Sequence, residues 1–234
     1  ASIHSVKVNI VSKLFIIPTP IGNLEDMSFR AVRLLQEAAL ILCEDTRVTI
    51  KLLKHYDIDT RMLSFHQHNE HRILESIVSR IAAGEVMALV SDAGMPGISD
   101  PAFLLVRACV GGGIPVEALP GPTAFIPALV ASGLPCDRFC FEGFLPVKKG
   151  RQTRLKTLLD ESRTMVFYES PHRLVKTLKD FADLFGPERK VCVSREISKL
   201  YETHHRGNLS ALYQEFSNKT VKGEITIILA GKGD

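Results

Sequence analysis

Two carboxylates and a guanidinium stand together in the segment Glu44-Asp45-Thr46-Arg47, directly after an apolar run. Side chains of these types can position a hydroxyl, accept its proton or hold a phosphate. A structural role is also open, because Asp45 or Thr46 could cap a helix and Arg47 could pair with a carboxylate in its first turn. We therefore expect Glu44, Asp45 and Arg47 to form a catalytic, substrate-side cluster or, failing that, a helix start.

Two loops rich in proline and glycine could hold a ligand through their backbone. Residues 18–24 contain two prolines and one glycine, a stiff turn that either approaches a ligand or only connects two elements. Residues 93–99 are mostly small and turn-forming, which suits a cofactor bound by backbone N–H and C=O groups. Neither loop matches a Gly-x-Gly-x-x-Gly or P-loop fingerprint, so a conventional NAD or ATP site is disfavoured. Asp100, which precedes Pro101, is expected to cap the following helix.

The histidine and cysteine patterns do not indicate a metal site or a covalent nucleophile. His66, His68 and His71 are close in sequence, but no carboxylate or thiol stands beside them at a typical ligand spacing. The five cysteines contain no Cys-x-x-Cys pair, and no Gly-x-Ser-x-Gly elbow is present. We expect no bound metal, reduced thiols and a cytoplasmic protein; without an apolar run of about 18–20 residues, a membrane span is disfavoured.

Positive charge is concentrated in the second half of the chain. The formal net charge is only +3, yet the first 120 residues carry two more acidic than basic residues, and the remainder carries five more basic ones. The densest stretch, residues 148–156, holds five cations and no acid. We expect Lys148, Lys149, Arg151 and Arg154 to bind RNA backbone, with a solvated helix start as the alternative.

The hydrophobic periodicity predicts an α/β protein with two domains. In the first half, four apolar runs alternate with stretches of helical period, which indicates a mostly parallel sheet covered on both faces. The expected strands are 14–17, 40–43, 86–90 and 115–119, and the expected helices are 28–38, 46–55, 69–83 and 101–110.

The second half has a different order of elements. Two strands follow one another without a helix between them, which predicts a hairpin and a mixed sheet. The expected strands are 139–141, 165–168, 191–195, 201–205 and 225–229, and the expected helices are 124–132, 151–160, 172–184 and 208–217. The change of pattern at the Pro-Gly-Pro sequence of residues 120–122 predicts a domain boundary, with domains 13–120 and 121–232.

Six motifs stand in a fixed order along the chain. They are Thr19-Pro20-Ile21-Gly22-Asn23-Leu24, Glu44-Asp45-Thr46-Arg47, Ser91-Asp92-Ala93-Gly94-Met95-Pro96, Ser132-Gly133-Leu134-Pro135, Gly143-Phe144-Leu145-Pro146 and Phe167-Tyr168-Glu169-Ser170. Together they resemble the tetrapyrrole methylase superfamily of S-adenosylmethionine-dependent enzymes, and within it the branch that methylates RNA of the small ribosomal subunit. The resemblance implies a two-domain tetrapyrrole-methylase-like fold, a homodimer, and a cofactor in the cleft between the domains.

The same resemblance implies methylation of the ribose 2′-hydroxyl of a cytidine in 16S rRNA. The superfamily's Gly-x-Pro-x-x-x-Asp pattern is matched by Gly94, Pro96 and Asp100. The implied contacts to S-adenosylmethionine are Pro20, Ile21, Gly94, Met95, Pro96, Ile98, Thr123, Ala124 and Tyr168. A carboxylate that accepts the hydrogen bond of the ribose hydroxyl would help a poor nucleophile, and we assign this role to Glu44 or Asp45, with Arg47 holding the RNA backbone.

Two other functions remain open. A small-molecule methylase of the same fold, acting on a tetrapyrrole, would need an apolar trough of porphyrin size and would not need the basic stretch. A non-catalytic RNA-binding module would lose nothing when the cofactor loop is removed.

Overall fold

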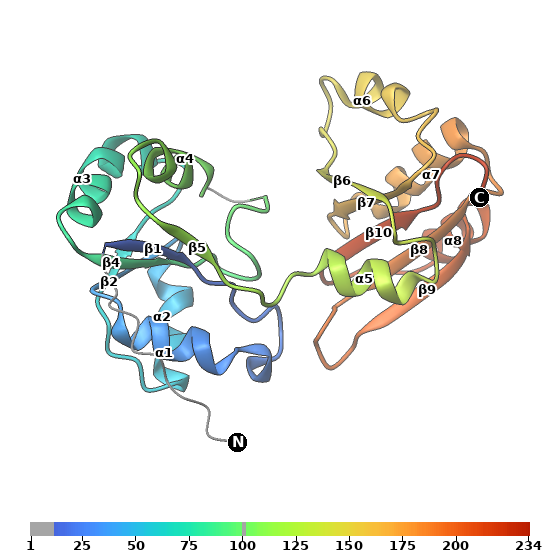
Figure 1. Cartoon of the computed structure of the whole chain (residues 1–234). Coiled ribbons are helices and arrows are strands. Elements are labelled where there is room, and N and C mark those ends of the chain that lie inside the picture. The colour runs from blue at the N-terminus through green and yellow to red at the C-terminus, as the bar shows by residue number, and fades with distance from the viewer. Residues whose placement is uncertain (1–11, 100–101) are drawn as a thin grey trace. The chain divides into compact units, whose positions relative to one another are not determined.

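The computed structural model describes residues 12–99 and 102–234, and the chain forms two compact units, Ala1–Pro122 and Thr123–Asp234 (Figure 1). The division between the units lies at the end of the Pro-Gly-Pro turn of residues 120–122. Each unit is built around a five-stranded sheet. The helix cap expected at Asp100 falls outside the described residues.

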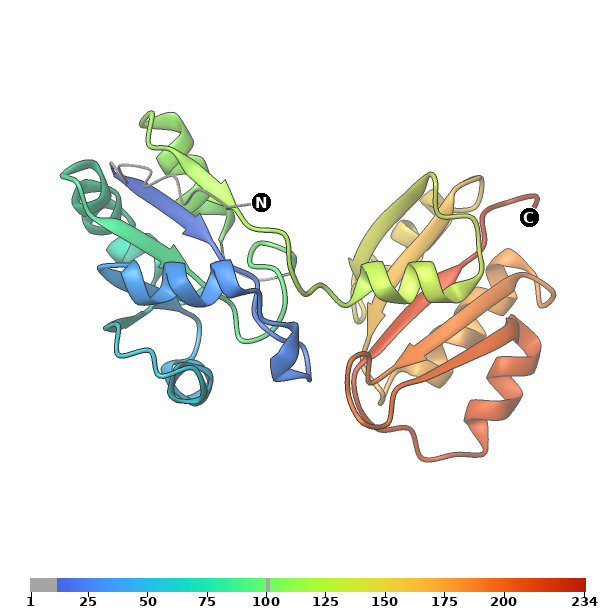
Figure 2. The same ribbon diagram turned by 60° about the horizontal axis from the view of Figure 1, so that its bottom comes forward.

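Among the described residues, the sheet of the first unit is wholly parallel. Its strands are β1 (Lys13–Ile16), β2 (Leu40–Cys43), β3 (Met62–Ser64), β4 (Val86–Leu89) and β5 (Val116–Ala118), in the spatial order β3-β2-β4-β1-β5. The helices are η1 (Leu24–Asp26), α1 (Phe29–Glu37), α2 (Thr46–His55), α3 (Glu70–Ala82) and α4 (Phe103–Gly111). Figure 2 shows α1 and α2 on one face of the sheet and α3 and α4 on the other. Because both faces are buried, the strands consist of continuous apolar runs.

The second unit has a mixed sheet, as its sequence predicts. Its strands are β6 (Phe139–Phe144), β7 (Thr164–Glu169), β8 (Lys190–Arg195), β9 (Thr203–Asn208) and β10 (Ile225–Leu229), in the order β6-β7-β10-β8-β9. Only β6 and β7 pair in parallel, while β7 with β10, β10 with β8, and β8 with β9 pair antiparallel. The helices are α5 (Phe125–Ser132), α6 (Arg151–Thr157), α7 (Leu174–Phe185) and α8 (Leu209–Ser217). α6, α7 and α8 share one apolar core with the sheet, and α5 lies against the other face.

Several local expectations differ from the structure. β3 has no counterpart among the predicted strands. The helix expected over 124–132 begins one residue later, at Phe125, with Ala124 as its N-cap and no side-chain hydrogen bond. The helix expected from residue 172 begins only at Leu174, and in the turn before it the Ser170 hydroxyl accepts the His172 N–H at 3.3 Å.

All five cysteines are unpaired, and burial raises the pKa of the Cys43, Cys109 and Cys192 thiols. Across residues 12–99 and 102–234, no helix combines the length and apolar character that crossing a bilayer requires.

Candidate active site

The carboxyl end of β4 is a point where neighbouring connections diverge. β4 lies between β2 and β1 in the sheet. The helices that follow β1 and β2, α1 and α2, pack on one face of the sheet. The helix that follows β4, α4, packs on the opposite face. Open α/β sheets bind ligands in the crevice that such divergence creates at the carboxyl ends of the strands. The loops expected to carry chemistry follow these three strands.

A backbone cradle joins the loops that follow β1 and β4. The Thr19 N–H donates to the Gly94 carbonyl at 3.0 Å, and the Gly94 N–H donates back to the Thr19 carbonyl at 2.9 Å. The Thr19 hydroxyl donates to the Ser91 carbonyl at 3.1 Å, and the Ser91 hydroxyl donates to the Gly94 carbonyl at 3.0 Å. Two loops distant in sequence are thus held as one rigid surface.

Gly94 presents bare backbone on this surface. Its φ of +83° is a conformation that L side chains rarely adopt, and a Cβ would lie 3.5 Å from Cγ2 of Ile21. A second close approach occurs at Gly121, where a Cβ would lie 2.3 Å from Cγ of Pro18. Glycine at position 94 therefore allows the positive φ, and glycine at position 121 lets the backbone after β5 approach the Pro18 ring in the loop after β1.

The other expected cofactor contacts of the first unit lie on the same two loops. Pro20, Ile21, Met95 and Ile98 are half-buried, and Pro96 is buried. The arrangement matches a ligand that is held by apolar side chains and backbone rather than by charged groups. No residue of the cradle itself carries a formal charge.

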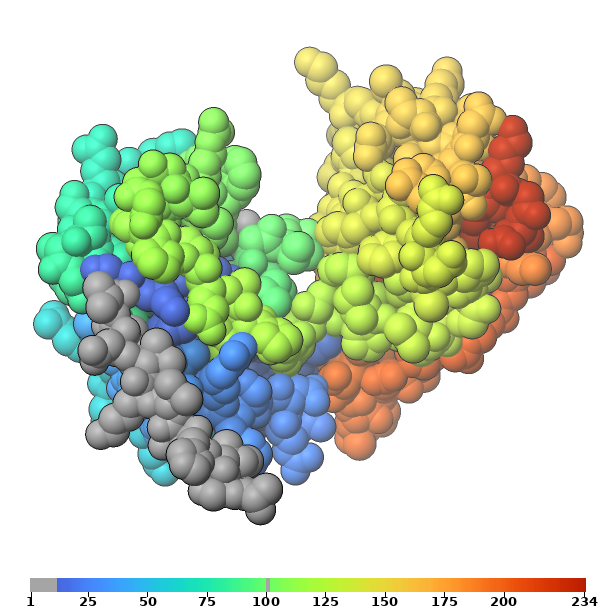
Figure 3. Space-filling view, in the orientation of Figure 1, coloured from blue at the N-terminus to red at the C-terminus, as the bar shows by residue number. Residues whose placement is uncertain are grey.

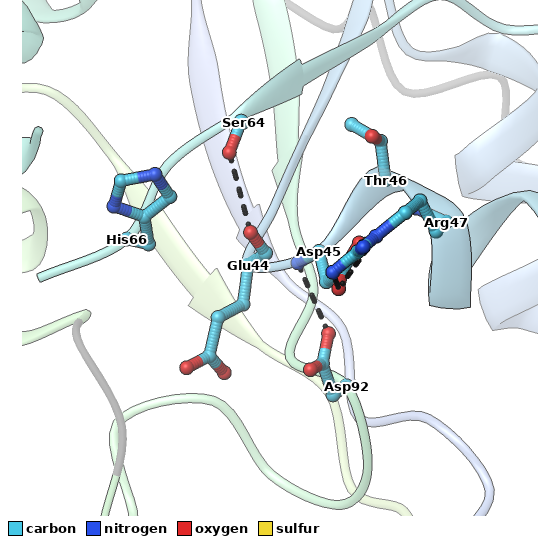
Figure 4. A pocket seen from close by; sticks show the side chains of 7 residues that line it. All are labelled: Glu44, Asp45, Thr46, Arg47, Ser64, His66 and Asp92. Atoms are coloured by element: carbon cyan, nitrogen blue, oxygen red, sulfur yellow. Dashed lines mark hydrogen bonds and ion pairs between the residues drawn. The ribbon is translucent and has the colours of Figure 1, made fainter. Parts of the chain in front are cut away.

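An acidic hollow of about 390 Å³ lies beside the cradle, at the ends of β2, β3 and β4 (Figure 4). Its lining residues are Glu44, Asp45, Thr46, Arg47, Ser64, His66 and Asp92. Figure 4 shows the Glu44 side chain extending between those of His66 and Asp92. The hollow therefore contains three carboxylates and one guanidinium, a composition suited to a polar substrate.

Asp45 performs the structural role that the sequence left open. It is the N-cap of α2, and its Oδ1 accepts the Arg47 N–H at 2.8 Å. The Arg47 guanidinium grips the same carboxylate, with Nη2 2.7 Å from Oδ2. These hydrogen bonds lower the pKa of Asp45 to about 2. A carboxylate so strongly held in its ionised form is a weak proton acceptor, which leaves Glu44 and Asp92 as the better candidates.

Asp92 ties the hollow to the loop that carries the cradle. Its Oδ1 accepts the Asp45 N–H at 3.1 Å, so the end of β4 is fastened to the end of β2. Asp92 stands two positions before Gly94 in the chain. The hollow and the cradle therefore share one loop. Asp92 is a lining residue to which the sequence-based expectations give no role.

Ser64 and His66 are site residues that the sequence analysis missed. They lie at and just after the end of β3, and the Ser64 hydroxyl donates to the Glu44 carbonyl at 3.2 Å. The His68 N–H donates to Nδ1 of His66 at 3.2 Å, which leaves Nε2 of a neutral ring to carry the proton. The His66-x-His68 pair is the one sequence signal for this part of the site, and the sequence-based interpretation treats it only as a possible metal site. No cluster suited to a metal ion occurs among the described residues.

Tyr168, the expected contact of the second unit, belongs to a row of aromatic rings. Its ring lies 5.3 Å from that of Phe141 and 5.6 Å from that of Phe144, and Phe141 stacks on Phe125 at 4.6 Å. Burial raises the pKa of Tyr168 to about 12. Ala124 and Thr123 precede this row at the start of α5, so all three expected contacts lie around Phe125.

The basic stretch does not behave as one surface. Arg151 is only 4% exposed and donates to Asp180 at 2.9 Å, to Thr177 at 2.9 Å and to the Pro146 carbonyl at 3.2 Å. It therefore fixes the loop before α6, contrary to the expectation that it binds RNA. Arg154 is half exposed and paired with Glu142. Lys148 and Lys149 are exposed, as expected.

Comparison with known proteins agrees with this architecture. The family model for Tetrapyrrole (Corrin/Porphyrin) Methylases matches residues 13–213. A curated relative from Escherichia coli O157:H7, named Ribosomal RNA small subunit methyltransferase I, is 47% identical over 232 residues, which span 97% of this chain and 81% of the relative. A relative of the same name from Thermotoga maritima is 46% identical over 222 residues, which span 95% of this chain and all of the relative.

A solved structure shares the fold at low sequence identity. Uroporphyrin-III C-methyltransferase from Thermus thermophilus, complexed with S-adenyl homocysteine, superposes with a TM-score of 0.63 at 21% identity and covers 94% of this chain and 97% of its own. The chain belongs to the tetrapyrrole (corrin/porphyrin) methylase family, alongside relatives named Ribosomal RNA small subunit methyltransferase I.

Proposed function

We propose that this protein transfers a methyl group from S-adenosylmethionine to the 2′-hydroxyl of a cytidine ribose in 16S rRNA. Its family and its relatives' names support the reaction and the class of RNA. The observation that carries the proposal is the shared loop after β4, where Asp92 lines the acidic hollow and Gly94 forms the cradle. A methyl donor on the cradle and an acceptor hydroxyl in the hollow would be neighbours.

The cradle around Gly94 fits S-adenosylmethionine. Its backbone is bare at a position where a Cβ would protrude beside Ile21, and its uncharged walls suit an adenosine and a methionine chain. When bound, S-adenosylmethionine supplies an electrophilic methyl group carried on a sulfonium. Pro20, Met95 and Ile98 would contact it by the resemblance to the family. The contribution of Thr123, Ala124 and Tyr168 stays a prediction.

Glu44 is our candidate for the carboxylate that accepts the hydrogen bond of the ribose hydroxyl. Its side chain extends into the hollow between those of His66 and Asp92. The hydrogen bonds with Arg47 lower the pKa of Asp45 to about 2, which makes Asp45 the weaker proton acceptor. Accepting this hydrogen bond aligns the hydroxyl oxygen, and the Glu44 carboxylate would take the proton as the oxygen–methyl bond forms and the sulfur–methyl bond breaks, leaving sulfur as a neutral thioether. Arg47, whose side chain is 88% exposed, remains able to reach a phosphate from the rim.

Conservative substitutions in the hollow test this assignment. Glu44→Gln should lower methyl transfer to RNA about 10²- to 10⁴-fold, the usual contribution of a positioned acid or base. It should leave S-adenosylmethionine affinity unchanged. Asp45→Asn is the control, with a small effect on turnover at 25 °C. Wild-type turnover in Glu44→Gln, or the large loss in Asp45→Asn, would contradict the assignment.

Lys148 and Lys149 are our proposed contacts to the RNA backbone, since Arg151 is buried and Arg154 already pairs with Glu142. Changing both lysines to alanine should flatten the log–log salt dependence of RNA binding by about 0.7–0.9 per lost phosphate contact. An unchanged slope would place the RNA elsewhere.

A matched control for this experiment removes the same charge from the same unit. Lys179 and Lys219 each form an ion pair one helical turn away, with Asp183 at 2.6 Å and Glu215 at 2.8 Å. Changing both to alanine should leave the salt slope as in the wild type, because their charges are already balanced locally.

We also propose that the protein is a homodimer and that it lies in the cytoplasm. Sedimentation would test the first statement and cell fractionation the second.

A further inference from the structure

A β-bulge in β6 redirects one aromatic side chain. Phe141 pairs with Val166 and Gly143 with Phe167, so Glu142 is the extra residue of the bulge. Gly143 has a φ of +61°, which glycine adopts at little cost. Without the bulge, residues 141 and 144 would point to opposite faces of the sheet. With it, Phe144 pairs with Tyr168 and lies on the same face as Phe141.

Phe144 is the exposed end of the aromatic row. Phe125, Phe141 and Tyr168 are partly covered by their neighbours, whereas Phe144 remains 55% exposed. Its ring contacts that of Tyr168 in a tilted arrangement, at a centroid distance of 5.6 Å, so the side chain packs on the sheet while much of the ring stays exposed. A bulge that re-aims a phenylalanine toward solvent contributes little to the core, and such bulges are frequent beside functional sites.

Cations follow Phe144 closely in the chain. Lys148 and Lys149 are exposed four and five residues later, and no acid stands between residues 143 and 159. The loop that carries them is fixed at its base by Arg151, which donates to the Pro146 carbonyl at 3.2 Å. Figure 3 shows the yellow segment around residues 145–160 on the outer surface of the second unit. An exposed aromatic ring followed within five residues by two exposed lysines matches the chemistry of single-stranded nucleic acid, whose bases stack on aromatic rings while its phosphates attract lysines.

We propose that Phe144 is a stacking platform for an unpaired base of the RNA substrate, with Lys148 and Lys149 holding the adjoining phosphates. The inference rests on the proposed RNA methylation and deepens it, because it states that the substrate is read as single-stranded at this position. Stacking on an aromatic side chain is tolerant of base identity. Phe144 therefore contributes affinity and positions the strand but does not select the sequence.

Fluorescence tests the stacking directly, because the chain contains no tryptophan. Phe144→Trp introduces a single reporter at the platform. Titration with a cytidine-containing single-stranded oligoribonucleotide should quench its emission, and the quenching should saturate at the concentration that saturates RNA binding. The control is Val110→Trp, an exposed site near the C-terminal end of α4, and the emission of this variant should not change when RNA is added. No quenching in Phe144→Trp while RNA binds would overturn the proposal.

Affinity measurements separate this proposal from its alternatives. Phe144→Ala should weaken binding to the oligoribonucleotide about five- to hundredfold, Phe144→Tyr should restore it, and S-adenosylmethionine affinity should stay unchanged. Loss of S-adenosylmethionine affinity instead would assign Phe144 to the cofactor site and overturn the proposal, as would a change from dimer to monomer. If the wild-type protein neither binds nor methylates RNA, the proposed function itself fails. If the wild-type protein binds RNA and Phe144→Ala binds it equally well, only the stacking proposal fails.

Discussion

Gly94→Ala should weaken S-adenosylmethionine binding about five- to tenfold, and the structure allows the size of the effect to be worked out. The added Cβ would lie 3.5 Å from Cγ2 of Ile21 and 3.8 Å from the Pro122 carbonyl oxygen, which are ordinary contacts. The fold therefore suffers no clash. The free energy of unfolding falls only because of the positive φ of +83°, which costs an L residue about 1–2 kcal/mol.

The loss of affinity has a separate origin. A ligand lying on the backbone of this loop would be lifted by the new methyl group, and a gap of about 0.5–1 Å forfeits a quarter to a half of each dispersion contact. Over roughly 20 atom pairs worth about 0.15 kcal/mol each, the loss is about 1 kcal/mol, or five- to tenfold in Kd.

Gly84→Ala is the matched control for this substitution. Gly84 also has a positive φ, +113°, but a Cβ there has nothing within 4 Å, and the residue precedes β4 at the opposite edge of the sheet. Urea unfolding should show both variants destabilised by about 1–2 kcal/mol. Calorimetry should show weaker S-adenosylmethionine binding only in Gly94→Ala. Equal affinities in the two variants would refute the placement of the cofactor on this loop.

Three further predictions concern buried or perturbed side chains. Arg151→Met should lower the free energy of unfolding by about 2 kcal/mol, because the buried hydrogen bonds to Asp180, Thr177 and the Pro146 carbonyl are lost while Lys176 still pairs with Asp180; urea unfolding with an unchanged midpoint would contradict this. The Asp45 carboxyl should titrate near pH 2 by NMR, and its stabilisation of the α2 start, present above about pH 4, should be lost as the pH falls toward 2. A midpoint near 3.8 would show that the hydrogen bonds with Arg47 do not persist in solution. Tyr168 should ionise at about pH 12, so its contribution to stability is complete below pH 10 and lost between pH 10 and 12. In an absorbance titration, Tyr168→Phe should remove a tyrosine ionisation step near pH 12. An unchanged titration curve would contradict this.

The sequence predicted the parts of the fold that depend on continuous burial. β2 and β10 have the bounds that the sequence predicts, because both faces of these strands are covered and, apart from the buried Thr226, all their residues are apolar. The loops at the carboxyl ends of β1, β2 and β4 could therefore be placed at one edge of the sheet from the sequence alone. That placement carried the candidate site.

β3 could not be predicted in the same way. It is a three-residue edge strand that pairs only with β2, and Met62, Leu63 and Ser64 are not fully buried, so no apolar run marks it. Without this strand, nothing in the sequence places Ser64 and His66 at the carboxyl edge. Two lining residues of the hollow were missed for that reason.

The roles within the basic stretch also needed the tertiary structure, although one signal was present. Arg151, Leu155 and Leu158 recur at helical spacing and share the buried face of α6 and the residue after it. That periodicity, rather than charge density, indicates that Arg151 points inward. Phe144 carried no comparable signal, because an extra residue in a strand is invisible until its pairing partners are known.

Methyl transfer from labelled S-adenosylmethionine tests the central claim most directly. The wild-type protein would be incubated with 30S subunits, free 16S rRNA or porphyrinoids, and labelled RNA would be digested to nucleosides and analysed by mass spectrometry. We predict that the label enters RNA and is recovered in a single nucleoside, cytidine methylated on the ribose 2′-oxygen. Label recovered in a porphyrinoid, on a base, or in no RNA while S-adenosylmethionine binds normally would contradict the account.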